Sequence, residues 1–200
     1  MKTKRLKKPD IRRLYEIKNL LYDQKWAKTA RNIELYYMYR GVKKKKGLRY
    51  DITVIPPKTL GKEFVKTKGN RNSDNFPELY FVLKGEALML MQKTRGKAVE
   101  NVIAIKLKRG EAIIEPADYD VVTINSTNKE LKTANWVSEK NINSYDNMEK
   151  MKGMCYFYTK SGWVKNKNYE LRSKNKIPKL RFGKPLKDIP KNLDFLYGKN

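Results

Sequence analysis

Short runs of apolar and β-branched residues alternate with turn signals along most of this chain. Glycines at Lys84-Gly85-Glu86 and at Gly110 predict tight turns, because glycine adopts the backbone conformations that short connections need. Many short strands at this spacing predict an all-β domain that closes into a sandwich or barrel. We place the strands at 49–55, 62–67, 78–84, 87–92, 99–107, 111–115, 120–125, 131–137 and 154–159.

The N-terminal part follows a different pattern. Asp10 is of a type that caps helices, and the apolar positions after it recur at near-helical spacing, which predicts an N-terminal helix ending before Asn32. These apolar positions are Ile11, Leu14, Ile17, Leu20 and Leu21. Residues 33–42 are β-branched and aromatic and predict a strand, and the lysine run at 43–47 predicts a loop.

After Trp163 the chain becomes rich in lysine, asparagine and proline. We therefore divide it into three parts: 1–47, an N-terminal helix and first strand with a basic loop; 48–164, the barrel; and 165–200, a basic, proline-containing C-terminal extension. We expect this extension to wrap a surface or a partner subunit.

Composition limits the size of the folded core and the kinds of ligand that the protein can bind. The 200 residues suffice for one sizeable core. With 46 Lys and Arg against 21 Asp and Glu, the net charge is +25. Such a charge favours anionic ligands and permits nucleic acid as a partner. Because the basic residues are spread along most of the chain, we interpret them as solvated lysines and do not favour the nucleic-acid reading.

The sequence also indicates a compartment. No stretch approaches the ~20 apolar residues of a membrane span, so we expect no membrane association. The single cysteine, Cys155, lies in an apolar run and excludes a disulfide framework, which suits a reducing cytoplasm. We expect a buried, inert thiol and a cytoplasmic protein.

Two ordered motifs lie within the predicted barrel. The first runs Gly61-Lys62-Glu63-Phe64 through Thr67-Lys68-Gly69 to Glu78-Leu79-Tyr80 and Gly85; the second runs from Gly110 through Pro116 to Val121 and Asn125. Together with Asp51-Ile52-Thr53-Val54-Ile55 and Leu35-Tyr36-Tyr37, this string resembles the cupin-type phosphoglucose isomerases, a family found mainly in archaea and some bacteria. The resemblance covers residues 10–170.

The resemblance implies a cupin jelly-roll β-barrel, a homodimer, and interconversion of glucose 6-phosphate and fructose 6-phosphate, a step of glycolysis and gluconeogenesis. It assigns substrate phosphate contacts to Thr53, Thr67, Gly69 and Tyr36, and catalytic positions beside the sugar to Glu78 and Tyr80. The residue types fit, since hydroxyls and a glycine amide can donate hydrogen bonds to a phosphate. A carboxylate can move the proton between C1 and C2.

The family's metal positions are altered in this chain. The metal-bearing pattern has three histidines and Glu78 around iron, nickel, zinc or manganese. This chain has no histidine at all, and Asn70, Asn72 and Val121 fill those places. Because imidazole suits these ions and amide oxygens suit only hard cations weakly, we expect no metal cofactor.

The sequence does not determine which way the side chains around Asn70 point. Arg71 and Lys68 are both candidates to polarise the substrate carbonyl in place of a metal. Strict strand alternation turns Arg71 away from Asn70 and Asn72, so the segment must bend if all of it lines one pocket. We expect Asp118 and Asp120 to be exposed turn residues.

Three functions follow as hypotheses. The first is a glucose-6-phosphate isomerase homologue with weak or metal-independent activity. The second is a cupin that binds sugar phosphate without turning it over, and the third is a basic nucleic-acid-binding protein.

Overall fold

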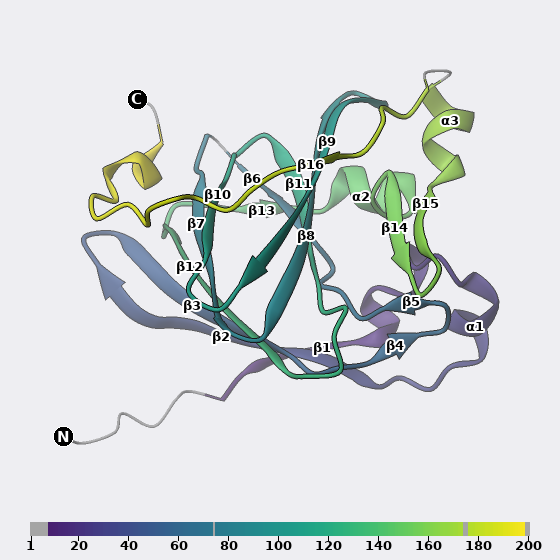
Figure 1. The fold of residues 1–200 in the computed structure, drawn as a ribbon, viewed down its shortest axis with the longest axis horizontal. Coiled ribbons are helices and arrows are strands. Elements are labelled where there is room, and N and C mark those ends of the chain that lie inside the picture. The colour runs from purple at the N-terminus through teal and green to yellow at the C-terminus, as the bar shows by residue number, and fades with distance from the viewer. Residues whose placement is uncertain (1–7, 74, 174–175, 199–200) are drawn as a thin grey trace.

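The computed structural model describes residues 8–73, 75–173 and 176–198, and its elements form three sheets (Figure 1). The first sheet has the order β1 (Asp10–Arg13), β2 (Glu34–Lys45), β3 (Leu48–Ile55), β12 (Leu131–Ser138), β7 (Glu78–Lys84), β10 (Ala112–Glu115). The second has the order β13 (Asn143–Ser144), β6 (Asn70–Asn72), β11 (Tyr119–Ile124), β8 (Glu86–Arg95), β9 (Ala98–Lys108), β16 (Arg181–Phe182). The third, smaller sheet has the order β15 (Gly162–Lys165), β14 (Tyr156–Thr159), β5 (Glu63–Phe64), β4 (Thr59–Leu60).

The two six-stranded sheets enclose the main core. Their strands pair antiparallel, apart from the parallel pairing of β16 with β9. One cluster of buried side chains draws on both sheets and contains Leu35, Ile55, Val82, Met89 and Leu107. Because one cluster fills the space between them, the two sheets form a single closed unit, and the all-β prediction is confirmed.

The predicted N-terminal helix is wrong over most of its length. Residues from Asp10 form strand β1, followed by the 3₁₀ turns Leu14–Glu16 and Lys18–Leu20, and the only α-helix in the described part of this segment is α1 (Gln24–Thr29). Asp23 caps α1 by accepting from the Trp26 N–H. The apolar spacing still marked the buried side, since Leu14, Ile17, Leu20 and Leu21 are in the core. Pairing of β1 with β2 overrode the helical pattern.

Most of the predicted strands are present with small shifts, and two boundaries are wrong. The strand predicted at 62–67 is reduced to β5, because the chain then moves from the third sheet to β11, where Lys66 forms an isolated bridge with Ile124. The loop predicted at 43–47 is largely strand, since β2 continues to Lys45 and turns at Lys46 and Gly47. The short strands β4, β6, β13, β15 and β16 were not predicted, nor were α2 (Asp146–Met151) and α3 (Lys167–Ser173).

The C-terminal extension runs back over the barrel (Figure 1, yellow). It adds β16 to the edge of β9 and ends in the 3₁₀ turn Asp194–Tyr197, where Leu196 is fully buried. Leu186 and Leu193 pack on the outer side of the first sheet with Leu196. The described part of the extension thus packs on its own barrel. Residues 1–7, 174–175 and 199–200 of the predicted terminal parts lie outside the described residues.

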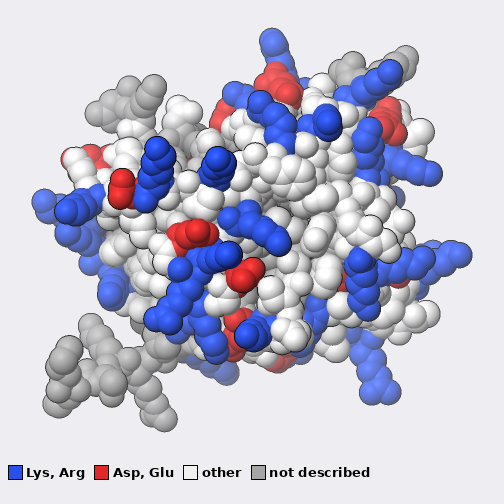
Figure 2. Space-filling view, viewed as in Figure 1, with Lys and Arg blue, Asp and Glu red and all other residues white. Residues whose placement is uncertain are grey.

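Basic side chains are scattered over the visible face rather than gathered in one stripe, and acidic side chains lie among them (Figure 2). Among the described residues, no helix is long and apolar enough to cross a membrane.

Candidate active site

One pocket opens into the barrel, and its cavity volume is about 90 Å³. The pocket brings together every predicted site residue except Asn72. Its polar lining residues are Arg12, Tyr36, Arg40, Arg49, Asp51, Thr53, Thr67, Lys68, Asn70, Glu78, Tyr80, Glu115, Thr123, Asn135, Asn143 and Tyr145.

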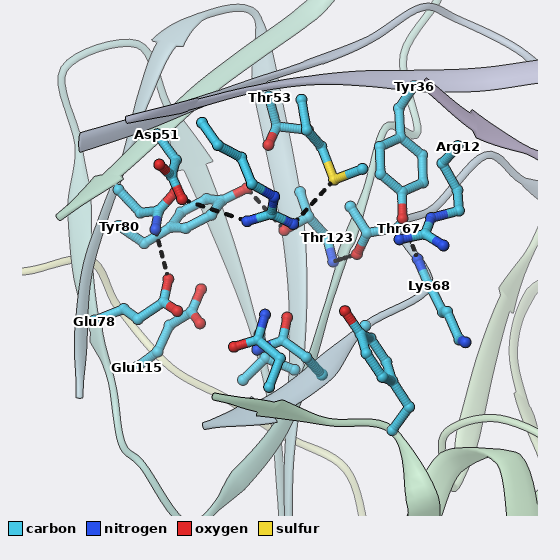
Figure 3. Close-up of a pocket in the computed structure, with 18 of the residues that line it drawn as sticks. Arg12, Tyr36, Asp51, Thr53, Thr67, Lys68, Glu78, Tyr80, Glu115 and Thr123 are labelled. Carbon is cyan, nitrogen blue, oxygen red and sulfur yellow. Dashed lines mark hydrogen bonds and ion pairs between the residues drawn. The ribbon is translucent and has the colours of Figure 1, made fainter. Parts of the chain in front are cut away.

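One end of the pocket is rich in hydrogen-bond donors (Figure 3). The Lys68 N–H donates to the Tyr36 hydroxyl oxygen at 2.9 Å, and the Thr123 N–H donates to Thr67 Oγ1 at 3.0 Å. Both hydroxyl oxygens therefore already accept from the protein, and their O–H protons remain available to a ligand. Thr53 also lines the pocket. The available O–H protons of Tyr36 and Thr67 favour an anionic ligand.

Gly69 lets the backbone follow the pocket wall closely. Its φ is +78°, and an added Cβ would lie 2.5 Å from Val122 Cγ1 and 2.7 Å from the Val121 carbonyl oxygen. Only glycine fits such a position without a shift of its neighbours. Because the segment bends here, Thr67, Lys68, Gly69 and Asn70 can all line the pocket, as the sequence argument required.

Arg12 belongs to this end and was missed by the sequence analysis. It comes from β1, its side chain is 18% exposed, and it lies beside Tyr36 in the pocket (Figure 3). Its NH1 pairs with Glu16 at 2.6 Å. Among the described residues, Arg12 Nε is the one buried side-chain polar atom without a hydrogen-bond partner. Because Arg12 lines the pocket and a guanidinium prefers an anion, this end of the pocket suits an anionic group.

Lys68 adds a second positive charge near the same end. Its ammonium pairs with Glu149 of α2 at 2.6 Å and lies 4.4 Å from the centre of the Tyr145 ring. The Lys68 side chain is only 15% exposed. This pairing ties α2 and Tyr145 to the rim of the pocket.

The other end of the pocket holds two carboxyl groups. Glu78 begins β7 and Glu115 ends β10; both are buried, and their carboxyl groups lie next to each other (Figure 3). Asn135 Nδ2 donates to Glu78 Oε2 at 2.8 Å. Glu115 was not predicted. The signal that was available is its place just before Pro116, where an acidic residue interrupts the apolar strand 112–114.

Burial shifts the acidity of both groups. Loss of solvent raises the pKa of Glu78 to about 7, against the opposing effects of a hydrogen bond from Asn72 and the charge of Arg49. Burial, followed by the negative charge of Glu78, raises the pKa of Glu115 well above its usual range. A group with a pKa near 7 can both accept and return a proton at neutral pH.

Tyr80 lines the pocket between the two ends. Its hydroxyl contacts Thr123 Oγ1 at 2.9 Å and donates to Thr133 Oγ1 at 2.9 Å, and burial raises its pKa. Thr123 in turn contacts Thr67, so this chain of contacts joins the donor-rich end to the wall beside Glu78. The geometry favours Tyr80 as a residue that positions its neighbours.

The positions that hold metal in the family do not fit a transition ion here. Asn72 Oδ1 accepts from Asn70 Nδ2 at 3.0 Å and from Asn141 Nδ2 at 3.1 Å, so this oxygen is already occupied by two donors. Val121 lines the pocket and offers no ligand atom. In the described part of the chain, no three His, Cys, Asp or Glu residues come together. Only Glu78 remains of the donor set.

Arg71 and Asp120 lie outside the pocket and pair with each other. Arg71 Nε and NH2 contact the two carboxylate oxygens of Asp120, each at 3.0 Å. The expected alternation of Arg71 away from Asn70 is therefore observed, and Arg71 is not available to polarise a substrate. The expectation of an exposed Asp120 is wrong: it is 2% exposed, because β11 extends through it and Gln92 and Asn147 also donate to it. Asp118 is exposed, as expected.

The β-barrel encloses a pocket with a donor-rich end and two buried carboxyl groups. A sequence profile described as "Glucose-6-phosphate isomerase (GPI)" matches residues 12–174. Since that is well over half of the chain, this protein belongs to the glucose-6-phosphate isomerase family. The predicted family is confirmed, and the all-β barrel that the resemblance implied is the fold observed.

Individual relatives agree with this assignment. The chain is 30% identical over 128 residues to the glucose-6-phosphate isomerase of Thermococcus litoralis, a match that covers 61% of this chain and 65% of the relative. It is 33% identical over 122 residues to that of Pyrococcus abyssi, covering 58% and 62%. The chain thus spans less than two thirds of the length of the relatives it matches.

Solved structures show a partial likeness of fold. A cupin superfamily protein from Desulfitobacterium hafniense covers 52% of this chain and 76% of its own, with a TM-score of 0.35 and 12% identity. An oxalate oxidase covers 50% of this chain and 49% of its own, with a TM-score of 0.41 and 11% identity.

Proposed function

We propose that this protein binds a phosphorylated sugar in the barrel and interconverts glucose 6-phosphate and fructose 6-phosphate slowly and without a transition metal. Membership of the family supports the reaction. The observation that carries the proposal is the grouping of the Arg12 guanidinium with the Tyr36 and Thr67 hydroxyls at one end of the pocket. A phosphate would occupy that end and leave the sugar carbons toward Glu78.

The proposed chemistry follows from the two ends of the pocket. Arg12, Lys68, Tyr36, Thr67 and the Gly69 amide hold the phosphate, and binding energy there places C1 and C2 of the open-chain sugar beside Glu78. Glu78 then moves the proton between these carbons. Slow turnover is expected, because a metal would stabilise the enediolate more strongly than a carboxyl group can.

Binding is tested by calorimetry with 5-phosphoarabinonate, an analogue of the open-chain intermediate. Charge-assisted hydrogen bonds contribute about 1.5–3 kcal/mol, so Arg12→Gln should weaken the analogue roughly 10- to 100-fold. Arg13→Gln is the matched control, since the neighbouring Arg13 pairs with Glu34 at 2.7 Å and does not line the pocket. It should leave affinity within about twofold.

Turnover is tested by a coupled assay on the same protein, kept in chelator. An isomerisation rate of wild type above that of Glu78→Gln supports the proposed isomerase activity. Analogue binding without any turnover would instead identify a sugar-phosphate-binding cupin, the alternative that the loss of the histidines favours. Equal binding by wild type and Arg12→Gln would contradict the proposed phosphate site.

A further inference from the structure

Glu115 is a buried carboxyl group that nothing in the pocket neutralises. It is 5% exposed, lines the pocket and lies beside Glu78 (Figure 3). No residue that the structure describes donates a hydrogen bond to its carboxyl group or forms an ion pair with it. A buried carboxylate without a partner is costly, and such a group keeps its proton instead. Glu115 is therefore a carboxylic acid in the free protein.

The register of the first sheet explains why the two groups meet. β10 and β7 are antiparallel neighbours, and Glu115 is paired with Glu78 across them. Directly opposite side chains contact each other, and two negative charges at such a pair destabilise the sheet. A single proton on the pair removes this repulsion, as it does for other carboxyl groups held close together.

Hydrogen bonding decides which of the two carries the negative charge. Asn135 Nδ2 donates to Glu78 at 2.8 Å, and a donor of this kind stabilises the carboxylate form. Glu115 receives no such donor from the described residues. The pair is thus a carboxylate, Glu78, beside a carboxylic acid, Glu115.

Resting on the isomerase function proposed above, we propose that Glu115 is a second catalytic residue, which transfers protons to and from the sugar oxygens while Glu78 transfers the proton between C1 and C2. The acid stands in for the electrophile that the family obtains from a metal. It needs no additional ion, because a proton supplied to the carbonyl oxygen stabilises the charge that develops there.

Glu78 and Glu115 together supply and accept every proton that the reaction moves. From the aldose, the Glu78 carboxylate removes the proton on C2 as Glu115 protonates O1, which gives a neutral enediol. The Glu115 carboxylate then takes the hydroxyl proton from O2 while Glu78 returns its proton to C1. The C2=O bond forms, the ketose leaves, and both residues are back in their starting states.

The test is the replacement of Glu115 by glutamine, which keeps the size of the side chain and removes the transferable proton. General acid–base catalysis contributes about 100-fold or more, so kcat of Glu115→Gln in the coupled assay should fall by at least that factor. Affinity for 5-phosphoarabinonate should stay within about threefold, because the phosphate end is untouched. Glu115→Asp restores a carboxyl group and should recover part of the lost rate, which a merely structural role would not produce.

The control is Glu100→Gln, which removes an exposed carboxyl group on β9 and should leave kcat and the affinity for 5-phosphoarabinonate unchanged. If Glu115→Gln turns over within about threefold of wild type, Glu115 is not catalytic and the isomerase proposal stands alone. If chelator stops wild-type turnover and Mg²⁺ restores it, the pair holds a cation and the proton-transfer proposal is wrong. If wild type binds the analogue and never turns over, the isomerase proposal fails, and Glu115 has no catalytic role to fill.

Discussion

The buried carboxyl group of Glu78 should make the stability of this protein depend on pH in a window where most proteins titrate histidine. Its pKa rises from 4.5 to about 7 on folding, chiefly through burial. The folded state therefore holds a proton more tightly than the unfolded chain, and stability is greatest below about pH 4.5 and is lost as pH rises through about 7. One pKa unit corresponds to about 1.4 kcal/mol, so the loss due to Glu78 is about 3 kcal/mol.

Glu78→Gln removes this titration, because an amide does not ionise. The free energy of unfolding is measured with urea at about pH 5 and at about pH 8. Between these two pH values, wild type should lose about 3 kcal/mol more than the variant. In a protein of this size that corresponds to a relative shift in Tm of about 6–12 °C. The chain has no histidine, so no imidazole obscures the window. Glu63, whose pKa burial also raises, titrates equally in both proteins. Loss of the Glu78 charge lowers the pKa of Glu115 in the variant, so about 3 kcal/mol is the upper limit of the difference.

The matched control, Glu100→Gln, removes an exposed carboxyl group and should lose stability in parallel with wild type. Parallel curves for Glu78→Gln and wild type would contradict this prediction, because they would mean that Glu78 ionises in the folded protein as easily as in the unfolded chain.

Further substitutions test the pocket and its surroundings. Gly69→Ala should lower stability by about 1–3 kcal/mol, because φ is +78° and the new Cβ meets Val122 at 2.5 Å; Gly96→Ala, at φ +59° with nothing within 4 Å, should cost less in the same melting experiment. Tyr36→Phe should weaken 5-phosphoarabinonate by about 5- to 10-fold in calorimetry, and an unchanged affinity would exclude its hydroxyl from the site. Arg71→Gln should lower stability by about 1–3 kcal/mol by loosening buried Asp120, without changing analogue affinity, since Arg71 lies outside the pocket.

The barrel could be predicted from the sequence because each of its long strands has a recognisable local pattern. Alternation and turn glycines set the strands of the two large sheets, and the predicted strand at 78–84 has the bounds of β7. The N-terminal segment could not be predicted in this way. Its apolar spacing fits a helix as well as it fits a strand and two 3₁₀ turns, and only pairing with β2 selects between them.

The site residues also fall into two groups, those that the sequence could predict and those that it could not. Thr53, Thr67 and Gly69 belong to a long motif and were found from it, whereas Arg12 and Glu115 enter the pocket through tertiary pairing alone. β1 brings Arg12 across from the N-terminus, and the register of β10 with β7 sets Glu115 against Glu78. Neither pairing is visible in local sequence, since a shift by one residue would turn either side chain to the opposite face.

The central claim is that this family member holds its sugar phosphate without a transition metal. It is tested most directly by measuring the metal content of protein purified without chelator, together with isomerisation before and after chelation. We predict far less than one equivalent of iron, nickel, zinc or manganese per chain and a rate that chelation leaves unchanged. One tightly bound equivalent of any of these metals, with turnover that disappears on its removal and returns on its addition, would contradict the account.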